Sequence, residues 1–371
     1  MRYTVEKSLL TGPNMKDHVF YMVMDNGIPE FTVNEWLDMK SARSPRTGRQ
    51  YAYSIVRFLN FLSENGKDYK SATKKDILQF IGIVMRGDEK IVPIKSAVTG
   101  GTGAYYLGVI KYFYRYLEDS DNPDLVVRLE NKVHRVSNQS YLYGQIWDMD
   151  TKEILKQKVL FPKSKKEHVK WYTEEQKEAI LSNLNTNRDK AIFLLSLQGM
   201  RIDEILMLRL DDYEPSKKTI QINYAKGGKS RKVFLTAKTI KYLEDYIMNE
   251  RSTVEEKVGV KEEMFLNIRG GKNFGQVVKY SNILKILKRA AEHAGLNPDM
   301  VRTHSGRSTW TMDMIHYQAE HPEDKISDAA IMLAGGWSSP SSMKPYLNMN
   351  DERILAATMK KKKKERDNNG T

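Results

Sequence analysis

The chain has 371 residues, which is long enough for two domains that each bury a core of their own. Its 60 lysines and arginines outnumber 47 aspartates and glutamates, and the formal charge of +13 favours a polyanionic partner, nucleic acid ahead of a membrane. The absence of cysteine excludes disulfides and thiolate metal sites, and no apolar run approaches the roughly 18 residues of a membrane helix. We expect a soluble protein of a reducing, intracellular compartment, without a signal peptide.

The first 120 residues show two patterns. In residues 1–30, an apolar run followed by Asp25-Asn26-Gly27 predicts a strand and a turn, so we expect a small N-terminal β element. In residues 31–120, apolar residues recur at helical spacing and predict a compact helical domain. The glycine-rich residues 100–103 lack the Gly-Lys-Ser/Thr ending of a nucleotide P-loop, and we interpret them as a flexible connection.

A basic, hydroxyl-rich segment at residues 40–47 precedes the second of these helices. Arg43 and Arg46 lie at the mouth of that helix, where they are candidate contacts for DNA phosphates, and a solvated turn is the alternative. Residues 121–170 show weak periodicity and include a basic stretch near their end, which favours a linker between two domains.

Residues 171–350 predict a second domain, which is also mostly helical. Thr173 and Gln176 have the spacing of a capping box, and Gly199 is placed to terminate an apolar helix. Two alternating segments on either side of a glycine- and lysine-rich turn predict a hairpin. The expected fold class is mainly α with a small antiparallel sheet. The expected helices and strands that follow Gly199 cover residues 201–208, 219–224, 231–235, 237–250, 281–294, 304–318 and 326–334, before a basic C-terminal tail at 351–371.

Five local patterns stand in order in this second domain. They are Gly199 to Glu204 with Arg201 inside, Lys226 in the hairpin turn, His304-Ser305-Gly306-Arg307, Gly336-Trp337, and Tyr346. Their order and spacing resemble the catalytic domain of the tyrosine recombinases, also called the phage integrase family. The resemblance covers most of residues 171–350, and residues 31–120 look like the helical core-binding domain of the family. The chain outside the final motifs is similar to bacterial integrases and transposon-encoded recombinases.

The resemblance implies a role for each residue. Arg201 and Arg307 would clamp the oxygens of a phosphodiester as negative charge builds on them, a task that suits the planar guanidinium. Glu204 follows Arg201 by one helical turn and would hold that guanidinium in position. His304 would contact the scissile phosphate and help with proton transfer at Tyr346, the implied nucleophile.

Trp337 and the hairpin complete the implied site. Trp337 occupies the position that is histidine in many family members. Because indole donates one N–H and cannot shuttle a proton, we expect it to contact the phosphate and to pack. Lys226 resembles the general acid that protonates the departing 5′ oxygen, and Lys229 is the competing candidate. Lys229 and Arg231 are also candidate DNA contacts of the hairpin.

The second arginine admits an alternative register. Many family members place their His-x-x-Arg box directly after a proline, a frame that here reads Asp299 to Arg302. In that register aspartate would replace histidine, and Arg302 would replace Arg307 as the second clamp. We prefer His304 with Arg307, because this choice keeps the histidine of the box.

The expected function is a site-specific DNA recombinase, an integrase or transposon recombinase. By resemblance it would cleave and rejoin double-stranded DNA through a 3′-phosphotyrosyl intermediate at Tyr346 and exchange strands through a Holliday junction. The implied assembly is a two-domain clamp that forms a homo-tetramer on DNA, with no cofactor, no metal and no membrane. We expect a cytoplasmic, nucleoid-associated protein of bacterial or phage origin; accessory recombination proteins and the target sequence are left open.

Two other functions are weighed against this one. A non-catalytic, sequence-specific DNA-binding regulator would explain the charge, and residues 328–347 resemble a helix-turn-helix in outline. It would leave the ordered set of arginines, lysine, histidine, tryptophan and tyrosine as a coincidence. A metal-dependent nuclease is the weakest candidate, because His316 and His321 lack acidic partners at the spacing of metal ligands.

Overall fold

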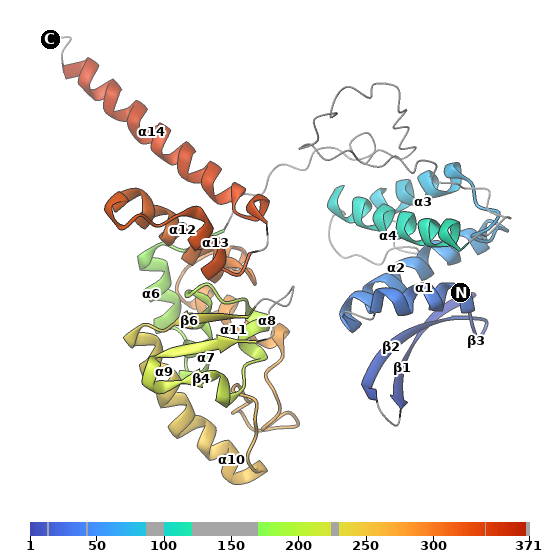
Figure 1. Cartoon of the computed structure of the whole chain (residues 1–371), viewed down its shortest axis with the longest axis horizontal. Coiled ribbons are helices and arrows are strands. Elements are labelled where there is room, and N and C mark those ends of the chain that lie inside the picture. Colours follow the sequence, from blue (N-terminus) through green and yellow to red (C-terminus); the bar gives the residue numbers. More distant parts are fainter. Residues whose placement is uncertain are drawn as a thin grey trace. The chain divides into compact units, whose positions relative to one another are not determined.

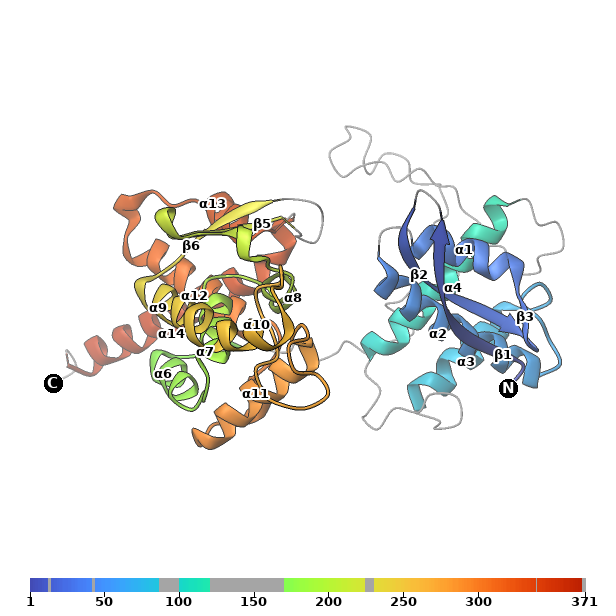
Figure 2. The same ribbon diagram turned by 90° about the horizontal axis from the view of Figure 1, so that it is seen from below.

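The computed structural model describes residues 1–12, 15–41, 44–86, 100–120, 170–223, 230–337 and 339–368. The chain divides into two compact units, Met1–Glu167 and His168–Thr371. It is mainly helical, and each unit contains one three-stranded antiparallel sheet (Figure 1, Figure 2). The predicted fold class is therefore confirmed.

The first unit begins with a long antiparallel hairpin. β1 (Tyr3–Gly12) pairs with β2 (Met15–Asp25), and the short β3 (Ile28–Pro29) pairs with the other edge of β2. Asn26 and Gly27 form the turn between β2 and β3, and both have positive φ. The expected β element thus contains a second long strand, Tyr3–Gly12, in addition to the predicted strand and turn.

The helices that the structure describes in the first unit are α1 (Phe31–Ser41), α2 (Pro45–Glu64), α3 (Lys74–Arg86) and α4 (Gly100–Asp119). Ser44 caps α2 by accepting a hydrogen bond from the backbone N–H of Thr47. The prediction of a loop at residues 100–103 is wrong, because these residues form the first turn of α4. The apolar face of α4 packs against α2 and α3, and this burial outweighs the low helix propensity of glycine.

The hairpin and the helices share one core. Val23 on β2 and Trp36 on α1 are both fully buried in it. The side-chain amide of Asn60 on α2 accepts a hydrogen bond from the Tyr3 backbone N–H and donates one to the Tyr3 carbonyl, both at 2.9 Å. Asn34 on α1 binds the backbone of Val23 in the same way, at 2.7 and 2.9 Å. These paired bonds anchor the sheet to the helices.

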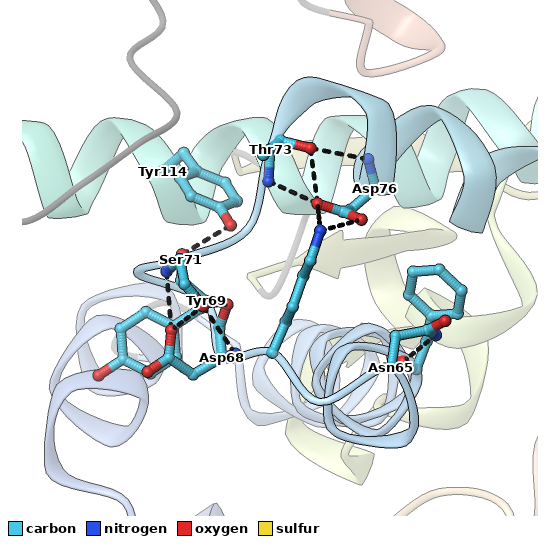
Figure 3. Close-up of polar contacts among 9 residues, drawn as sticks. Asn65, Asp68, Tyr69, Ser71, Thr73, Asp76 and Tyr114 are labelled. Atoms are coloured by element: carbon cyan, nitrogen blue, oxygen red, sulfur yellow. Dashed lines mark hydrogen bonds and ion pairs between the residues drawn. The ribbon is translucent and has the colours of Figure 1, made fainter.

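A polar network closes the connection between α2 and α3 (Figure 3). The Nζ atom of Lys67 lies 2.8 Å from both carboxylate oxygens of Asp76, which also accepts hydrogen bonds from Thr73. The hydroxyl of Tyr114 on α4 donates to the carbonyl of Tyr69 at 2.8 Å. Burial opposes the charge of Asp76, but its hydrogen bonds from Lys67 and Thr73 hold its pKa below the usual value. The network therefore fixes the start of α3 and its link to α4.

The second unit is organised around α7 (Asn187–Ser196), which is buried along almost its whole length. The predicted capping box before α6 (Glu174–Ser182) is present, because Thr173 and Gln176 each accept a hydrogen bond from the backbone N–H of the other. The remaining elements include strands β4 (Tyr213–Glu214), β5 (Thr219–Ile222) and β6 (Arg231–Phe234), and helices α8 (Ile202–Leu206), α9 (Ala237–Asp245), α10 (Ser252–Val258), α11 (Tyr280–His293), α12 (Ser305–Glu320), α13 (Asp328–Ala334) and α14 (Lys344–Asn368).

In the second unit, two further predicted segments extend differently in the structure. The helix expected at 237–250 consists of α9 and most of a π-helical segment, Tyr246–Arg251, and the chain continues as α10 to Val258. Residues 351–368 of the predicted basic tail continue α14. No glycine or proline interrupts the sequence between Tyr346 and Asn368, and alanine, leucine, methionine and lysine favour a helix there.

Candidate active site

A glycine turn after α7 begins the site. Gly199 has a φ of +84°, which favours glycine, and a Cβ atom built on it would lie 2.9 Å from the ring of Trp310. Its carbonyl oxygen accepts hydrogen bonds from Arg307 Nη1 at 2.9 Å and from Arg231 Nη2 at 3.4 Å. The turn thus gathers two arginines that are distant in the sequence.

Arg201 and Glu204 lie at the start of α8, as their spacing predicts. The Glu204 carboxylate accepts from the Arg201 backbone N–H at 2.9 Å and from Arg201 Nη1 at 2.5 Å. Arg201 Nη2 donates to the carbonyl of Gly336 at 3.1 Å. Glu204 therefore orients Arg201, and Arg201 ties α8 to the Gly335-Gly336-Trp337 turn.

Arg231 occupies a different place from the one expected of a DNA contact. Its side chain on β6 is only 6% exposed, and its Nη1 and Nη2 atoms donate to the two oxygens of Glu204 at 3.2 and 2.8 Å. A Cβ atom on Gly336 would lie 2.6 Å from Arg231 Nη1, so the glycine turn lies directly against this guanidinium. Arg231 is therefore a second, buried partner of Glu204, and its role as a DNA contact stays a prediction.

Arg307 is buried in the first turn of α12, with 4% of its surface exposed. Gly306 permits this position, because a Cβ there would collide with the side chain of Ser196 at the end of α7. Arg307 Nη1 binds the Gly199 carbonyl, and its guanidinium lies 5.3 Å from the ring centroid of Trp337. Its Nη2 atom is buried without a hydrogen-bond partner in the part of the chain that the structure describes.

Tyr346 lies near the start of α14, against Trp337. The two rings are stacked with centroids 5.4 Å apart and an interplanar angle of 28°. They belong to a small apolar cluster that includes Trp310, Ile331 and Met343 and is separate from the main core of this unit. The Tyr346 hydroxyl lies 3.0 Å from Ser308 Oγ on α12. The predicted nucleophile is thus held beside the buried Arg307 by residues of its own chain.

His304 and Arg302 lie on the exposed side of the same region. His304 is the N-cap residue of α12, and its carbonyl accepts the hydrogen bond of the Ser308 backbone N–H at 2.7 Å. The Arg302 backbone N–H donates to Ser305 Oγ at 2.9 Å. Of the two arginines that compete for the second clamp, Arg307 is the one that the structure places with Gly199 and Trp337.

The arginines of the site and their carboxylate partner carry a net positive charge. Arg201, Arg231 and Arg307 carry three positive charges, and within the described residues Glu204 supplies the one carboxylate that pairs with Arg201 and Arg231. Burial, followed by the positive charges of Arg201 and Arg231, lowers the pKa of Arg307 to about 9. A buried cation in an excess of positive charge is a site that an anion would stabilise.

Replacing Glu204 with glutamine should destabilise the second unit. Burial raises the pKa of Glu204, but the hydrogen bonds from Arg231 and Arg201 outweigh burial and hold it below its usual value. The ionised Glu204 carboxylate therefore contributes its full stabilisation of the fold above its unfolded-state pKa of about 4.3. This stabilisation is lost as the pH falls through the lower pKa that Glu204 has in the folded state. At pH 7, Glu204→Gln should lower the free energy of unfolding by about 3 kcal/mol, since the buried Arg231 and the partly buried Arg201 lose their carboxylate.

Urea unfolding of both proteins at several pH values measures this effect. The difference between wild type and Glu204→Gln should shrink at acidic pH, where the wild-type carboxylate is also neutral. Glu178→Gln is a suitable control, because Glu178 forms an exposed ion pair with Lys238. An equal loss for the two variants at pH 7 would contradict the role of Glu204.

Ser308 and the carbonyl oxygens of Gly199 and Gly336 were missed by reasoning from the sequence. Ser308 directly follows Arg307, and this adjacency was the available signal for it. No sequence motif identifies a backbone carbonyl that accepts a hydrogen bond from arginine, because the arginine belongs to an element that is distant in the sequence. Lys226, Lys229 and Arg43 lie outside the described residues, and Arg46 lies on α2 of the first unit.

Neither a cluster of metal ligands nor a membrane-crossing helix occurs within the described ranges. No group of three or more histidine, aspartate or glutamate side chains there is arranged to hold a metal ion. No described helix combines the length and the apolar character that crossing a bilayer requires.

Comparison with known proteins points to one family. Residues 170–353 match the phage integrase family. The tyrosine recombinase XerC of Caldanaerobacter subterraneus subsp. tengcongensis is 26% identical over 325 residues, which cover 86% of this chain and 82% of the relative. A tyrosine recombinase of Thermosipho africanus is 23% identical over 346 residues, covering 91% of this chain and all of the relative.

Solved structures show the same fold. XerH site-specific recombinase bound to its palindromic difH substrate superimposes with a TM-score of 0.58, at 17% identity, over 84% of this chain and 78% of the other. The Tn1549 transposon integrase in complex with circular intermediate DNA gives a TM-score of 0.54, at 14% identity, over 85% and 94%.

Proposed function

Because the chain belongs to the tyrosine recombinase family, we propose that it is a site-specific DNA recombinase, an integrase or transposon recombinase, with Tyr346 as its nucleophile. One observation carries the proposal. The buried guanidinium of Arg307 has no carboxylate among its hydrogen-bonding partners in the described residues and lies next to the Trp337 ring on which Tyr346 is stacked. A phosphodiester that filled this position would meet cations and a nucleophile together.

The proposed reaction needs two arginine clamps. Arg201 and Arg307 would bind the non-bridging oxygens of the scissile phosphate, whose charge increases in the transition state. Glu204 neutralises part of the cluster and orients Arg201, so the net positive charge remains directed at the phosphate. His304 is proposed to contact the phosphate from the N-terminus of α12, a position that favours an anion.

The covalent step conserves the bond energy of DNA. The phenolic oxygen of Tyr346 would attack phosphorus and pass its proton to His304, and the P–O bond to the 5′ oxygen would break. That oxygen would take a proton from Lys226, with Lys229 as the alternative. The 3′-phosphotyrosyl bond is itself a phosphodiester, so a 5′ hydroxyl of a partner strand can reverse the reaction without ATP. Repeated on two strands, this exchange would pass through a Holliday junction.

A nicked suicide substrate tests the proposal. Cleavage near the nick releases a short fragment that diffuses away, and the covalent complex accumulates. Wild-type protein should give this complex in EDTA, and peptide mass spectrometry should locate the DNA on Tyr346. A metal-dependent nuclease would be inactive in EDTA. A protein that binds specific DNA and never forms the complex would instead be the non-catalytic regulator.

The first unit offers a surface for duplex DNA. Before Glu64, α2 has three arginines and no acidic residue. Arg46, Arg49 and Tyr53 border a surface depression together with Tyr105 of α4. Arg49 also lies 5.8 Å from the ring centroids of both Tyr53 and Tyr21, and Tyr21 is on the hairpin. We propose that this surface binds DNA phosphates, so that the two units together clamp the duplex.

Replacing Arg49 with alanine should weaken DNA binding without preventing cleavage of bound DNA. The affinity should fall about tenfold at moderate salt, and the slope of log affinity against log salt should decrease by about one. Fluorescence anisotropy at several salt concentrations measures both quantities. Lys75→Ala, which removes an exposed cation of α3, is the control. An unchanged salt slope for Arg49→Ala would remove Arg49 from the DNA surface.

A homo-tetramer on DNA is the proposed assembly. Ile354, Leu355 and Met359 of α14 are 46%, 63% and 61% exposed, and Leu333 of α13 is 72% exposed. We propose that these apolar side chains are covered by a second copy of the chain when protomers meet on DNA. Accessory proteins would then act on this assembly, and the protein would be nucleoid-associated through its DNA.

A further inference from the structure

The hydroxyl group of Tyr346 has a partner in its own chain. Ser308 Oγ lies 3.0 Å from the Tyr346 oxygen, and either atom can donate the hydrogen. Ser308 is 5% exposed, so its hydroxyl is almost withdrawn from solvent. It follows Arg307 directly on α12, next to the guanidinium that is proposed to bind the phosphate.

The direction of this hydroxyl distinguishes it from its neighbours. Thr309 and Thr311, also buried on α12, donate to the carbonyls four residues earlier, at 2.8 and 3.0 Å. Such back-bonding is the ordinary use of a buried hydroxyl in a helix. Ser308 instead contacts a side chain of α14, across the interface between the two helices. Its hydroxyl therefore forms its hydrogen bond with Tyr346, the proposed nucleophile.

The tyrosine is held from two sides. Its ring stacks on Trp337 at 5.4 Å, and its oxygen binds Ser308. The stack restrains the plane of the ring, and the hydrogen bond restrains the position of the oxygen. Together they leave few rotamers open to a side chain that must reach phosphorus along one line.

Ser308 can assist the attack of the Tyr346 oxygen on phosphorus in two ways. When Ser308 accepts the phenolic hydrogen, a lone pair of the Tyr346 oxygen is left to face the phosphate. When Ser308 donates, it stabilises the phenolate that develops as the proton leaves. We propose that Ser308 is a catalytic residue of this recombinase, which orients the Tyr346 hydroxyl and stabilises its ionised form. This inference rests on the proposed function of the site.

Ser308→Ala in the full-length protein tests the inference. Single-turnover formation of the covalent complex on a nicked suicide substrate should slow by about 10- to 100-fold, the effect of one hydrogen bond to a developing charge. DNA affinity measured by anisotropy should stay within about twofold. In a plot of this rate against pH, the plateau should be reached at a higher pH in Ser308→Ala than in the wild type. The reason is that the developing phenolate no longer accepts a hydrogen bond from the Ser308 hydroxyl. A role in packing alone would not shift the pH profile.

Two further variants complete the experiment. Ser308→Thr keeps the hydroxyl and should recover most of the wild-type rate and the wild-type pH profile. Thr311→Val removes a buried hydroxyl of the same helix that binds the Arg307 carbonyl, and it should leave the pH profile unchanged. Wild-type rate in Ser308→Ala, or a slower rate with an unshifted profile, would overturn the proposal. If the wild-type protein formed no covalent complex, the proposed function itself would fail.

Discussion

Tyr346→Phe should abolish the covalent protein–DNA complex. The substitution removes the attacking oxygen, and we expect complex formation to fall by at least about 10³-fold, as for other lost nucleophiles. The phenyl ring can keep its stack on Trp337, so DNA affinity should change little. Loss of the hydrogen bond to Ser308 should cost about 1 kcal/mol of stability. The measurement is a denaturing gel of the suicide-substrate reaction.

A second tyrosine provides the matched control. Tyr317 on α12 is 42% exposed, and its hydroxyl binds Asp324 and none of the arginines of the site. Tyr317→Phe should form the complex at the wild-type rate. A Tyr346→Phe protein that still formed the complex would show that another residue is the nucleophile, and the motif order would then have misled the assignment.

Arg307→Met should separate activity from stability. The variant loses the guanidinium fork at the proposed phosphate position, and we expect cleavage to slow by about 10²- to 10³-fold. Methionine fills a similar volume without charge, and its presence relieves the repulsion of Arg307 by Arg201 and Arg231. The melting temperature should therefore stay equal or rise. Single-turnover cleavage and thermal unfolding, measured on one preparation, check both parts.

The same assays decide between the two registers of the second clamp. Arg302→Met should slow cleavage by less than about tenfold, because Arg302 is exposed and Arg307 is the residue bound to Gly199. Arg307→Lys should fall between wild type and Arg307→Met, since lysine keeps the charge and loses the planar fork. Severe loss in Arg302→Met alone would exchange the roles of the two arginines.

The sequence was informative where residues act at helical spacing. Arg201 and Glu204 are three residues apart, and the turn at the start of α8 brings them into contact. His304 and Arg307 have the same spacing, but His304 is exposed and Arg307 is buried. The capping box at Thr173 and Gln176 is equally local, and the structure contains it. Patterns of this range also predicted the mainly helical fold. They misjudged residues 100–103, because the burial that makes these glycines helical comes from α2 and α3.

Contacts between distant residues were decided by the tertiary structure alone. Arg201 reaches the Gly336 carbonyl across 135 residues of sequence, and Arg307 reaches that of Gly199 across 108. Ser308 and Tyr346 meet across 38. Arg231 resembles a surface cation in its strand, and only the packing of β6 beneath the glycine turn makes it a buried partner of Glu204. The sequence thus determined which residues are available for the site, and the tertiary packing determined which of them lie together. The physical reason is that a buried charge is stable only beside a partner, and here the partner comes from a distant part of the chain.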